Sequence, residues 1–320
     1  MNQHETSVKT FSDRVREQSG GENLDACYSC GTCVSKCMIQ QKVEPEYNPR
    51  RLLRMIMMDM EDEAYGDVTT WMCSQCDLCY PACPQQIHIS QLIQIVKQMA
   101  VEAGYSSPLE TVTVEENLCS GCGICVMACP YEAPSLFEKC LDGHMDRFAI
   151  VDANRCMGCG ICVAACPTGA IARKGVGNEE VNKRIRPLRS KNGKPSLAIF
   201  ICDWCLRADS DLSILENYPE SVHIIHIPCT GRNDPQLALM ALGRGYDGVL
   251  VCGCKPGECH YRRGTLISAC KMNIMSTMFG QMDLNRSAVR FVQIGTQERG
   301  RIRHEIETML QDIVPSLENS

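Results

Sequence analysis

The sequence is poor in aromatic residues and contains no long apolar stretch. Phe, Trp and Tyr make up 5% of the 320 residues, so large side chains do not fill the core in the usual way and room remains for an inorganic group. No apolar run reaches the roughly 18 residues that a membrane-spanning helix needs. The first 21 residues are polar and lack a signal-peptide pattern. We therefore expect a soluble, cytoplasmic protein.

The sequence also lacks an excess of positive charge. The formal net charge is -6 at pH 7, which argues against a general affinity for nucleic acid or anionic lipid. Charged residues at 22% and hydrophobic residues at 44% lie near globular averages and exclude a disordered chain. A chain of this length is expected to form two or three domains.

Cysteine, by contrast, is abundant. The chain has 24 cysteines, and in a reducing compartment so dense a set binds metal more often than it forms disulfides. One pattern, Cys-x-x-Cys-x-x-Cys-x-x-x-Cys, occurs four times. The four copies are Cys27, Cys30, Cys33, Cys37; Cys73, Cys76, Cys79, Cys83; Cys119, Cys122, Cys125, Cys129; and Cys156, Cys159, Cys162, Cys166.

The spacing within these repeats predicts 4Fe-4S clusters. Three thiolates two residues apart face one cuboidal cluster, and in two-cluster ferredoxins the fourth cysteine binds the neighbouring cluster. Zinc is the alternative, but zinc sites typically use two Cys-x-x-Cys pairs, so the third cysteine favours the cube. Glycines at 121, 123, 158 and 160 let backbone amides approach it. The predicted ligand sets are Cys119, Cys122, Cys125 with Cys166; Cys156, Cys159, Cys162 with Cys129; Cys27, Cys30, Cys33 with Cys83; and Cys73, Cys76, Cys79 with Cys37.

Helices and linkers are expected around the repeats. Asn48-Pro49 opens a helix, and residues 90–104 carry apolar side chains at helical spacing. Ser106 to Pro108 mark a linker. Residues 172–195 hold eight Lys or Arg among glycines and prolines, which is typical of a solvated tether; a basic docking strip for an acidic partner is the alternative. Met38 follows the first repeat, whereas proline follows each of the other three. The sequence therefore leaves open whether the chain turns away after the first repeat as it does after the others.

From Ser196 onward, short β-rich runs alternate with helical stretches, which predicts an α/β domain with a parallel sheet. The expected strands are Leu197–Cys202, Val222–Pro228, Asp247–Cys252 and Val289–Ile294. The expected helices are 206–217, 235–243, 262–280 and 297–314. Residues 243–248 match a dinucleotide-binding pattern by letter, but they follow a helix and precede a strand, so we interpret them as a helix end and a turn.

Most of the other eight cysteines follow expected strands. The carboxyl ends of parallel strands share one edge of a sheet, so these cysteines should converge in space. Four thiolates on separate loops suit a 2Fe-2S cluster or zinc, which leaves one or two bystanders. Cys140 and Cys270 lie elsewhere and are interpreted as packing or surface thiols. The six candidates are Cys202, Cys205, Cys229, Cys252, Cys254 and Cys259, of which Cys252 is also interpreted as part of a buried strand.

Three blocks of sequence resemble known families. Similarity to the C protein of heterodisulfide reductase (HdrC) lies in Ala-Cys27-Tyr-Ser-Cys30-Gly-Thr-Cys33, in Pro49-Arg-Arg-Leu-Leu-Arg-Met and in Trp71-Met-Cys73-Ser-Gln-Cys76-Asp-Leu-Cys79-Tyr-Pro-Ala-Cys83-Pro84. The middle block resembles a bacterial two-cluster ferredoxin. Similarity to the delta subunit of methyl-viologen-reducing hydrogenase (MvhD) lies in Cys202-Asp-Trp-Cys205, in Pro-Cys229-Thr-Gly-Arg232-Asn-Asp-Pro235, in Asp247-Gly-Val-Leu-Val and in Gly253-Cys254-Lys-Pro-Gly-Glu-Cys259-His260-Tyr261.

These resemblances imply a multidomain fold. An α-helical two-cluster iron-sulfur domain of the HdrC type is expected at 1–107, an α+β bacterial-ferredoxin-like domain at 108–175, a basic linker at 176–195 and an α/β domain with a parallel sheet at 196–320. The MvhD family carries a 2Fe-2S cluster, so the implied cofactors are four 4Fe-4S clusters and one 2Fe-2S cluster. Trp204 and His260 are expected to pack around it, with a ligand role for His260 as the alternative. The implied 2Fe-2S ligands are four of Cys202, Cys205, Cys229, Cys254 and Cys259.

The implied function is that of an electron-transfer protein within a larger complex. Proteins of this kind connect a hydrogenase, formate dehydrogenase or NADH dehydrogenase to an HdrA-like flavoprotein or an HdrB-like acceptor in a heterodisulfide-reductase-like complex, where flavin-based electron bifurcation is expected. One alternative is a stand-alone oxidoreductase that reduces a disulfide or small substrate at the C-terminal cluster. It is disfavoured because no two cysteines are adjacent and no Gly-rich turn follows an expected strand to hold a flavin. Another is a zinc-stapled scaffold or redox sensor.

Overall fold

The computed structural model describes residues 9–141, 144–187, 195–205, 221–295, 298 and 300–313. The chain divides into two compact units, Met1–Leu109 and Glu110–Ser320. Among the described residues, no helix is both long enough and apolar enough to cross a membrane.

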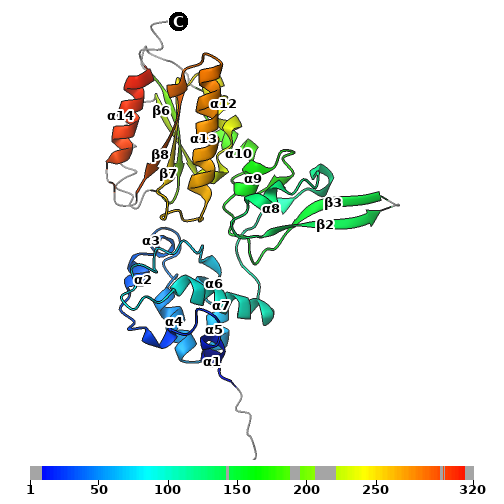
Figure 1. The fold of residues 1–320 in the computed structure, drawn as a ribbon, viewed down its shortest axis with the longest axis vertical. Helices are drawn as coiled ribbons and strands as arrows, with labels where there is room; N and C mark the ends of the chain where they lie inside the picture. Colours follow the sequence, from blue (N-terminus) through cyan, green and yellow to red (C-terminus); the bar gives the residue numbers. More distant parts are fainter. Residues whose placement is uncertain are drawn as a thin grey trace, which may run out of the picture. The chain divides into compact units, whose positions relative to one another are not determined.

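The described part of the first unit consists of helices (Figure 1). Its two longest helices contribute to the core, because α4 buries Leu52, Leu53 and Ile56 while α7 buries Leu92 and Val96. The elements are α1 (Phe11–Arg16), η1 (Leu24–Ala26), α2 (Thr32–Ser35), α3 (Met38–Lys42), α4 (Pro49–Met57), α5 (Glu61–Gly66), α6 (Val68–Met72) and α7 (Ile89–Glu102).

Both long helices follow the sequence prediction. Helix α4 starts at Pro49, and the Asn48 side chain accepts a hydrogen bond of 3.0 Å from the Arg51 backbone N–H, which caps the helix start. Helix α7 is followed by Gly104 with φ at 92°, the left-handed conformation in which helices often end. Met38 begins α3 and is buried, so the first repeat continues into a helix where the others meet proline.

The first part of the second unit has a ferredoxin-like arrangement. Two antiparallel pairs, the short pair β1 with β4 and the longer hairpin β2 with β3, flank the cysteine loops. Its small core joins Val112, Ala133 and Ile171 to cysteines of both repeats, so sulfur occupies places that aromatic rings fill elsewhere. The elements are β1 (Thr113–Val114), η2 (Glu116–Leu118), α8 (Ile124–Ala128), β2 (Pro134–Leu141), β3 (His144–Val151), α9 (Ile161–Ala165) and β4 (Ile171–Ala172).

The rest of the second unit contains a four-stranded parallel sheet in the order β6-β5-β7-β8. Figure 1 shows α14 on one side of this sheet and α12 and α13 on the other. The predicted parallel α/β arrangement is confirmed, and the helix expected over 206–217 lies outside the described residues. The elements are β5 (Leu197–Cys202), β6 (Val222–Ile227), η3 (Thr230–Arg232), α12 (Pro235–Gly243), β7 (Gly248–Cys254), α13 (Gly264–Gln281), η4 (Arg286–Ala288), β8 (Val289–Ile294) and α14 (Arg301–Ile313).

The string at 243–248 is a helix end and a turn, as predicted. Helix α12 ends at Gly243, Gly245 has φ at 99°, and β7 begins at Gly248. A Cβ atom at Gly248 would lie 2.5 Å from the Ile313 side chain and 2.9 Å from those of Leu197 and Met309. The glycine therefore lets α14 pack closely against the sheet.

The prediction of a solvated tether is wrong for residues 176–187. Helix α10 (Asn178–Arg184) occupies this segment, and Val181 and Ile185 are buried in one core with Ala198 and Phe200 of β5. The apolar residues at 181 and 185 lie one helical turn apart, so one face of a short helix packs on the sheet although its other residues are polar or charged.

Candidate metal centres

All four cysteine loops share one backbone conformation. Ser29, Gln75 and Asp77 hold left-handed φ angles although each has a side chain, at a cost of about 1 to 2 kcal/mol per residue. Left-handed residues aim successive amides to one side and form concave anion sites of the kind found at iron-sulfur centres. The residues flanking the second cysteine of each loop have the φ angles Ser29 54° and Gly31 84°, Gln75 55° and Asp77 60°, Gly121 63° and Gly123 77°, and Gly158 62° and Gly160 77°.

The first loop lines a cavity together with the last cysteine of the second repeat. Cys27, Cys30, Cys33 and Cys83 all border this space. Burial raises the pKa of Cys33 to about 11, with a further contribution from the charges of Cys27 and Cys30. The structure thus brings this predicted set together.

In the second loop, Cys37 of the first repeat lies among the thiols. Burial raises the pKa of Cys73 to about 12, and the charges of Cys76 and Cys37 add to the effect. Cys37 also acts on Cys79, whose pKa burial raises strongly. These thiols therefore keep their protons at neutral pH in the metal-free chain, and metal binding has to displace them.

Tyr47 is a site residue that the sequence did not indicate. Its ring is buried, and its hydroxyl group donates a hydrogen bond to the sulfur of Cys73. A tyrosine before a helix cap carries no motif, so only the tertiary structure reveals the contact.

The ferredoxin-like part groups its thiols in the same crossed way. Burial raises the pKa of Cys125, and Cys119, Cys122 and Cys166 add to the shift. Burial also raises the pKa of Cys159 to about 12, with Cys129 and Cys156 contributing. The backbone N–H of Ala149 donates a hydrogen bond of 3.4 Å to the Cys119 sulfur.

Four thiols meet at the carboxyl edge of the parallel sheet. The sulfurs of Cys202 and Cys254 are 3.8 Å apart. Hydrogen bonding with Cys229 and Cys254 lowers the pKa of Cys259. The pKa of Cys229 is raised by Cys259, and that of Cys254 is raised first by Cys202 and then by Cys259. The Cys205 thiol instead donates to the carbonyl oxygen of Cys202 at 3.1 Å.

Three aromatic side chains pack together beside this group of thiols. The rings of Trp204 and His260 stack with centroids 3.4 Å apart, and Tyr261 meets both rings edge-on. Burial raises the pKa of Tyr261, and the charges of Cys159 and Cys229 add to the shift. Tyr261 therefore lies close to both the ferredoxin-like part and the sheet edge.

The other cysteines lie apart from these groups. Cys140 on β2 and Cys270 on α13 are exposed, and Cys252 is buried within β7. Among the described residues, no three His, Cys, Asp or Glu side chains gather closely enough around one point to hold a single metal ion.

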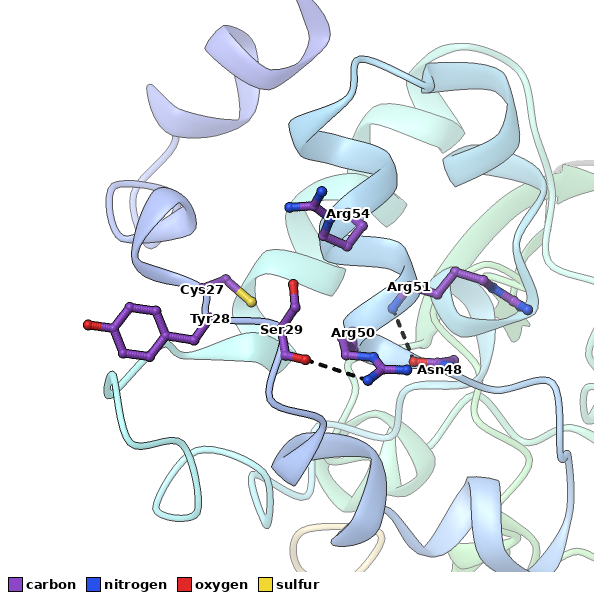
Figure 2. Close-up of a pocket in the computed structure, with 7 residues that line it drawn as sticks. All are labelled: Cys27, Tyr28, Ser29, Asn48, Arg50, Arg51 and Arg54. Atoms are coloured by element: carbon purple, nitrogen blue, oxygen red, sulfur yellow. Dashed lines mark hydrogen bonds between the residues drawn. The ribbon is translucent and has the colours of Figure 1, made fainter.

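A basic cavity of about 640 Å³ opens beside the first loop. Figure 2 shows the Cys27 sulfur, Ser29 and the side chains of Arg50 and Arg54 around it, with Tyr28 directed outward. Arg51 is held by Glu46 and Asp67, whereas Arg50 and Arg54 form no ion pair within the part of the chain that the structure describes. The thiol cavity of the first loop shares Cys27, Ser29 and Arg50 with this basic cavity.

Comparison with known proteins identifies the C-terminal part. Residues 197–315 match the family model of the methyl-viologen-reducing hydrogenase, delta subunit. The chain is 30% identical over 111 residues to the iron-sulfur D protein of the F420-non-reducing hydrogenase from Archaeoglobus profundus, an alignment that covers 34% of this chain and 81% of that protein. The chain belongs to this hydrogenase delta family. Residues 197–315 are called the MvhD-like domain below.

The cysteine repeats match models of the 4Fe-4S dicluster domain. Residues 23–87 contain the first two repeats, 118–170 the last two, and 72–133 the second and third. The chain therefore carries 4Fe-4S dicluster domains in addition to the MvhD-like domain.

Two further relatives are components of heterodisulfide reductases. The chain is 31% identical over 100 residues to the C component of the H(2):CoB-CoM heterodisulfide,ferredoxin reductase from Methanothermobacter marburgensis, covering 31% of this chain and 52% of that protein. It is 32% identical over 147 residues to the A component of the ferredoxin:CoB-CoM heterodisulfide reductase from Methanosarcina mazei, covering 45% of this chain and 18% of that protein. The chain thus spans about half of the one and about a fifth of the other. These relatives support an iron-sulfur electron-transfer role.

Proposed function

We propose that the chain is an electron-transfer subunit of a heterodisulfide-reductase-like complex. The observation that carries this proposal is the presence of four like cysteine loops and one MvhD-like domain on a single chain. Iron-sulfur clusters, when bound, accept and release single electrons. The cysteines would hold them, and the loop amides would stabilise their negative charge.

We assign the cofactors as four 4Fe-4S clusters and one 2Fe-2S cluster. The crossed grouping of the thiols supports the four predicted 4Fe-4S ligand sets. The sulfur contacts at the sheet edge favour Cys202, Cys229, Cys254 and Cys259 for the 2Fe-2S cluster, with Cys205 as the bystander. Stacking on Trp204 supports a packing role for His260 and not a ligand role.

The arrangement supports a conduit with two limbs. In the second unit, Tyr261 lies near both Cys159 and Cys229, so the ferredoxin-like part and the MvhD-like domain form one limb. The HdrC-like first unit forms the other. The proposed partners are a hydrogenase, formate dehydrogenase or NADH dehydrogenase as donor, an HdrA-like flavoprotein and an HdrB-like acceptor, with electron bifurcation at the flavin.

Anaerobic reconstitution tests this function. The full chain is expected to bind about 18 irons, the sum of four 4Fe-4S clusters and one 2Fe-2S cluster, and to show paramagnetic signals of both types after reduction with dithionite. The reduced chain should pass electrons to a flavoprotein isolated from the native complex. A colourless, zinc-loaded protein would contradict the proposal. Turnover of a disulfide or a quinone without any partner would favour a stand-alone enzyme.

The basic cavity is the proposed docking point of the first limb. The first unit as a whole is acidic, with nine Lys and Arg against fourteen Asp and Glu over residues 1–109, yet Arg50 and Arg54 face this cavity. Tyr28 beside them is 74% exposed, and exposed Tyr and Arg are enriched in protein interfaces. We infer that an acidic face of a redox partner docks here, above Cys27, Cys30 and Cys33.

Charge reversal at Arg54 should slow this docking. We expect Arg54→Glu to lower the association rate with the isolated partner about tenfold or more at low salt, because electrostatic steering is lost, and the difference should vanish at high salt. Stopped-flow reoxidation of the reduced chain measures the rate. Lys9→Glu makes the same change in net charge away from the cavity and should have little effect. Equal slowing by both variants would remove the specific role of Arg54.

A further inference from the structure

Arg232 is a buried cation that forms no ion pair with any residue that the structure describes. It lies in η3 close to Cys229, and its side chain has no exposed surface. Its Nε donates a hydrogen bond of 2.5 Å to the Val176 carbonyl oxygen, and its Nη2 donates one of 2.7 Å to Asn178 Oδ1. Both acceptors are neutral, and the buried Nη1 has no hydrogen-bond partner in the part of the chain that the structure covers.

This situation is unfavourable unless an anion is bound nearby. Burial lowers the pKa of Arg232 to about 10, so the guanidinium group stays charged at neutral pH. Asp234 counteracts the shift in pKa but forms no ion pair with Arg232 within the described ranges. Buried charges in proteins are almost always paired, because leaving water unpaired is strongly unfavourable.

The surroundings of Arg232 indicate where the anion lies. A Cβ atom at Gly160 would be only 3.0 Å from the Arg232 Cδ, so the arginine packs directly on the fourth cysteine loop. The charge of Cys162, in the same loop, acts on Arg232. A Cβ atom at Gly231 would be 2.9 Å from the Ile161 side chain, which shows that η3 and α9 fit tightly together.

Different groups pack against the glycines of the third cysteine loop. A Cβ atom at Gly121 would meet the backbone carbonyl group of Arg147, and one at Gly123 would lie 3.4 Å from the Leu136 side chain. In the fourth loop the second such glycine, Gly158, is covered by the Arg173 guanidinium group at 3.0 Å. Cationic groups therefore face the fourth loop, whereas neutral groups face the glycines of the third.

We propose that Arg232, supplied by the MvhD-like domain, is the counter-charge of the cluster assigned to Cys129, Cys156, Cys159 and Cys162 and raises its reduction potential above that of the other ferredoxin-like cluster. A nearby cation stabilises the reduced form because that form carries one more negative charge. Arg232 is a positioning and tuning residue and not a ligand. The proposal rests on the proposed cluster content. It identifies this cluster as the one that exchanges electrons with the MvhD-like domain.

A redox titration of the reconstituted full chain, followed by paramagnetic resonance, tests this role. Arg232→Gln should make reduction of one ferredoxin-like cluster about tenfold less favourable, which for one electron is a shift of about 59 mV to a more negative midpoint. The midpoints of the other clusters should stay unchanged. Arg232→Lys keeps a cation and should restore most of the shift.

Arg244→Gln is the matched control. Arg244 also donates hydrogen bonds to the α10 segment, at the carbonyl oxygens of Asn182 and Ile185, whereas the side chains nearest to the fourth-loop glycines are those of Arg173 and Arg232. A purely structural role would destabilise both variants and shift neither midpoint. An unchanged midpoint in Arg232→Gln with all clusters present would overturn this inference alone. Absence of 4Fe-4S clusters from the unmodified chain would instead overturn the proposed function.

A measurement without a variant at Arg232 covers the case in which Arg232→Gln does not fold. Arginine labelled with ¹⁵N in its guanidinium group is introduced into the double variant Arg173→Lys with Arg262→Lys, because Arg173 packs on Gly158 and Arg262 donates to the Pro130 carbonyl oxygen beside Cys129. Arg232 then remains as the labelled guanidinium group packed on the fourth loop. Pulsed paramagnetic resonance should then show a weakly coupled ¹⁵N nucleus at the higher-potential ferredoxin-like cluster. The lack of any such coupling at that cluster would refute the contact.

Discussion

Replacing Cys254 with alanine is expected to remove the 2Fe-2S cluster, about two of about 18 irons, together with its paramagnetic signal. The reason is the place of Cys254 in the thiol group, because its sulfur lies 3.8 Å from that of Cys202 and its pKa responds to both Cys202 and Cys259. Loss of this ligand should abolish electron exchange through the MvhD-like domain. Iron analysis and spectroscopy of the reduced full chain measure both effects.

Cys205→Ala provides the sharpest comparison with Cys254→Ala. Its thiol donates to the Cys202 carbonyl oxygen, so we expect this variant to keep the 2Fe-2S signal and the full iron content. Cys270→Ala, at an exposed position on α13, serves as the neutral control. If Cys205→Ala loses the cluster while Cys229→Ala keeps it, the assigned ligand set is wrong.

Double variants should reveal the crossed ligation of the ferredoxin-like clusters. If Cys166 shares a cluster with Cys122, then Cys122→Ala with Cys166→Ala should lose no more than about four irons, because both changes strike one cluster. Cys159→Ala with Cys166→Ala should lose about eight irons, because two clusters are struck. The physical basis is the nearness of Cys166 to Cys125 and of Cys129 to Cys159.

The reverse result would identify uncrossed loops. In that case the pair of changes at Cys159 and Cys166 would cost about four irons and the pair at Cys122 and Cys166 about eight. The single variants serve as controls, and each should lose at most about four. A melting curve for every variant separates loss of a cluster from loss of the fold.

Much of the fold could be predicted because its signals are local. The strand at Val289–Ile294 and the helix at Pro235–Gly243 have the predicted bounds, since runs of β-branched residues and a capped, proline-started helix depend on near neighbours. The segment at 176–187 shows the limit. Its charges suggested a solvated tether, but burial of Val181 and Ile185 against β5 depends on a sheet that is distant in sequence.

The candidate site, like the fold, could be predicted from the sequence only in part. Spacing alone indicated which cysteines belong to the four repeats, because a cube needs three ligands on one short loop. Spacing could not indicate which four of Cys202, Cys205, Cys229, Cys254 and Cys259 would hold the proposed 2Fe-2S cluster. Those thiols lie on different strand ends, and their contacts are set by how the sheet is assembled.

By itself, the sequence determined the chemistry of this protein: sulfur in repeated loops, glycines beside the second cysteine of the last two loops, and an MvhD-like domain. Only the tertiary structure decided which groups surround those loops. Tyr47 beside Cys73 carries no local pattern. Arg232 stands in a block that resembles MvhD, but nothing in that block indicates that its side chain packs on Gly160. The physical reason is that ligand spacing is a property of a few bonded residues, whereas the charges and hydrogen bonds that tune a buried site come from segments brought together by packing.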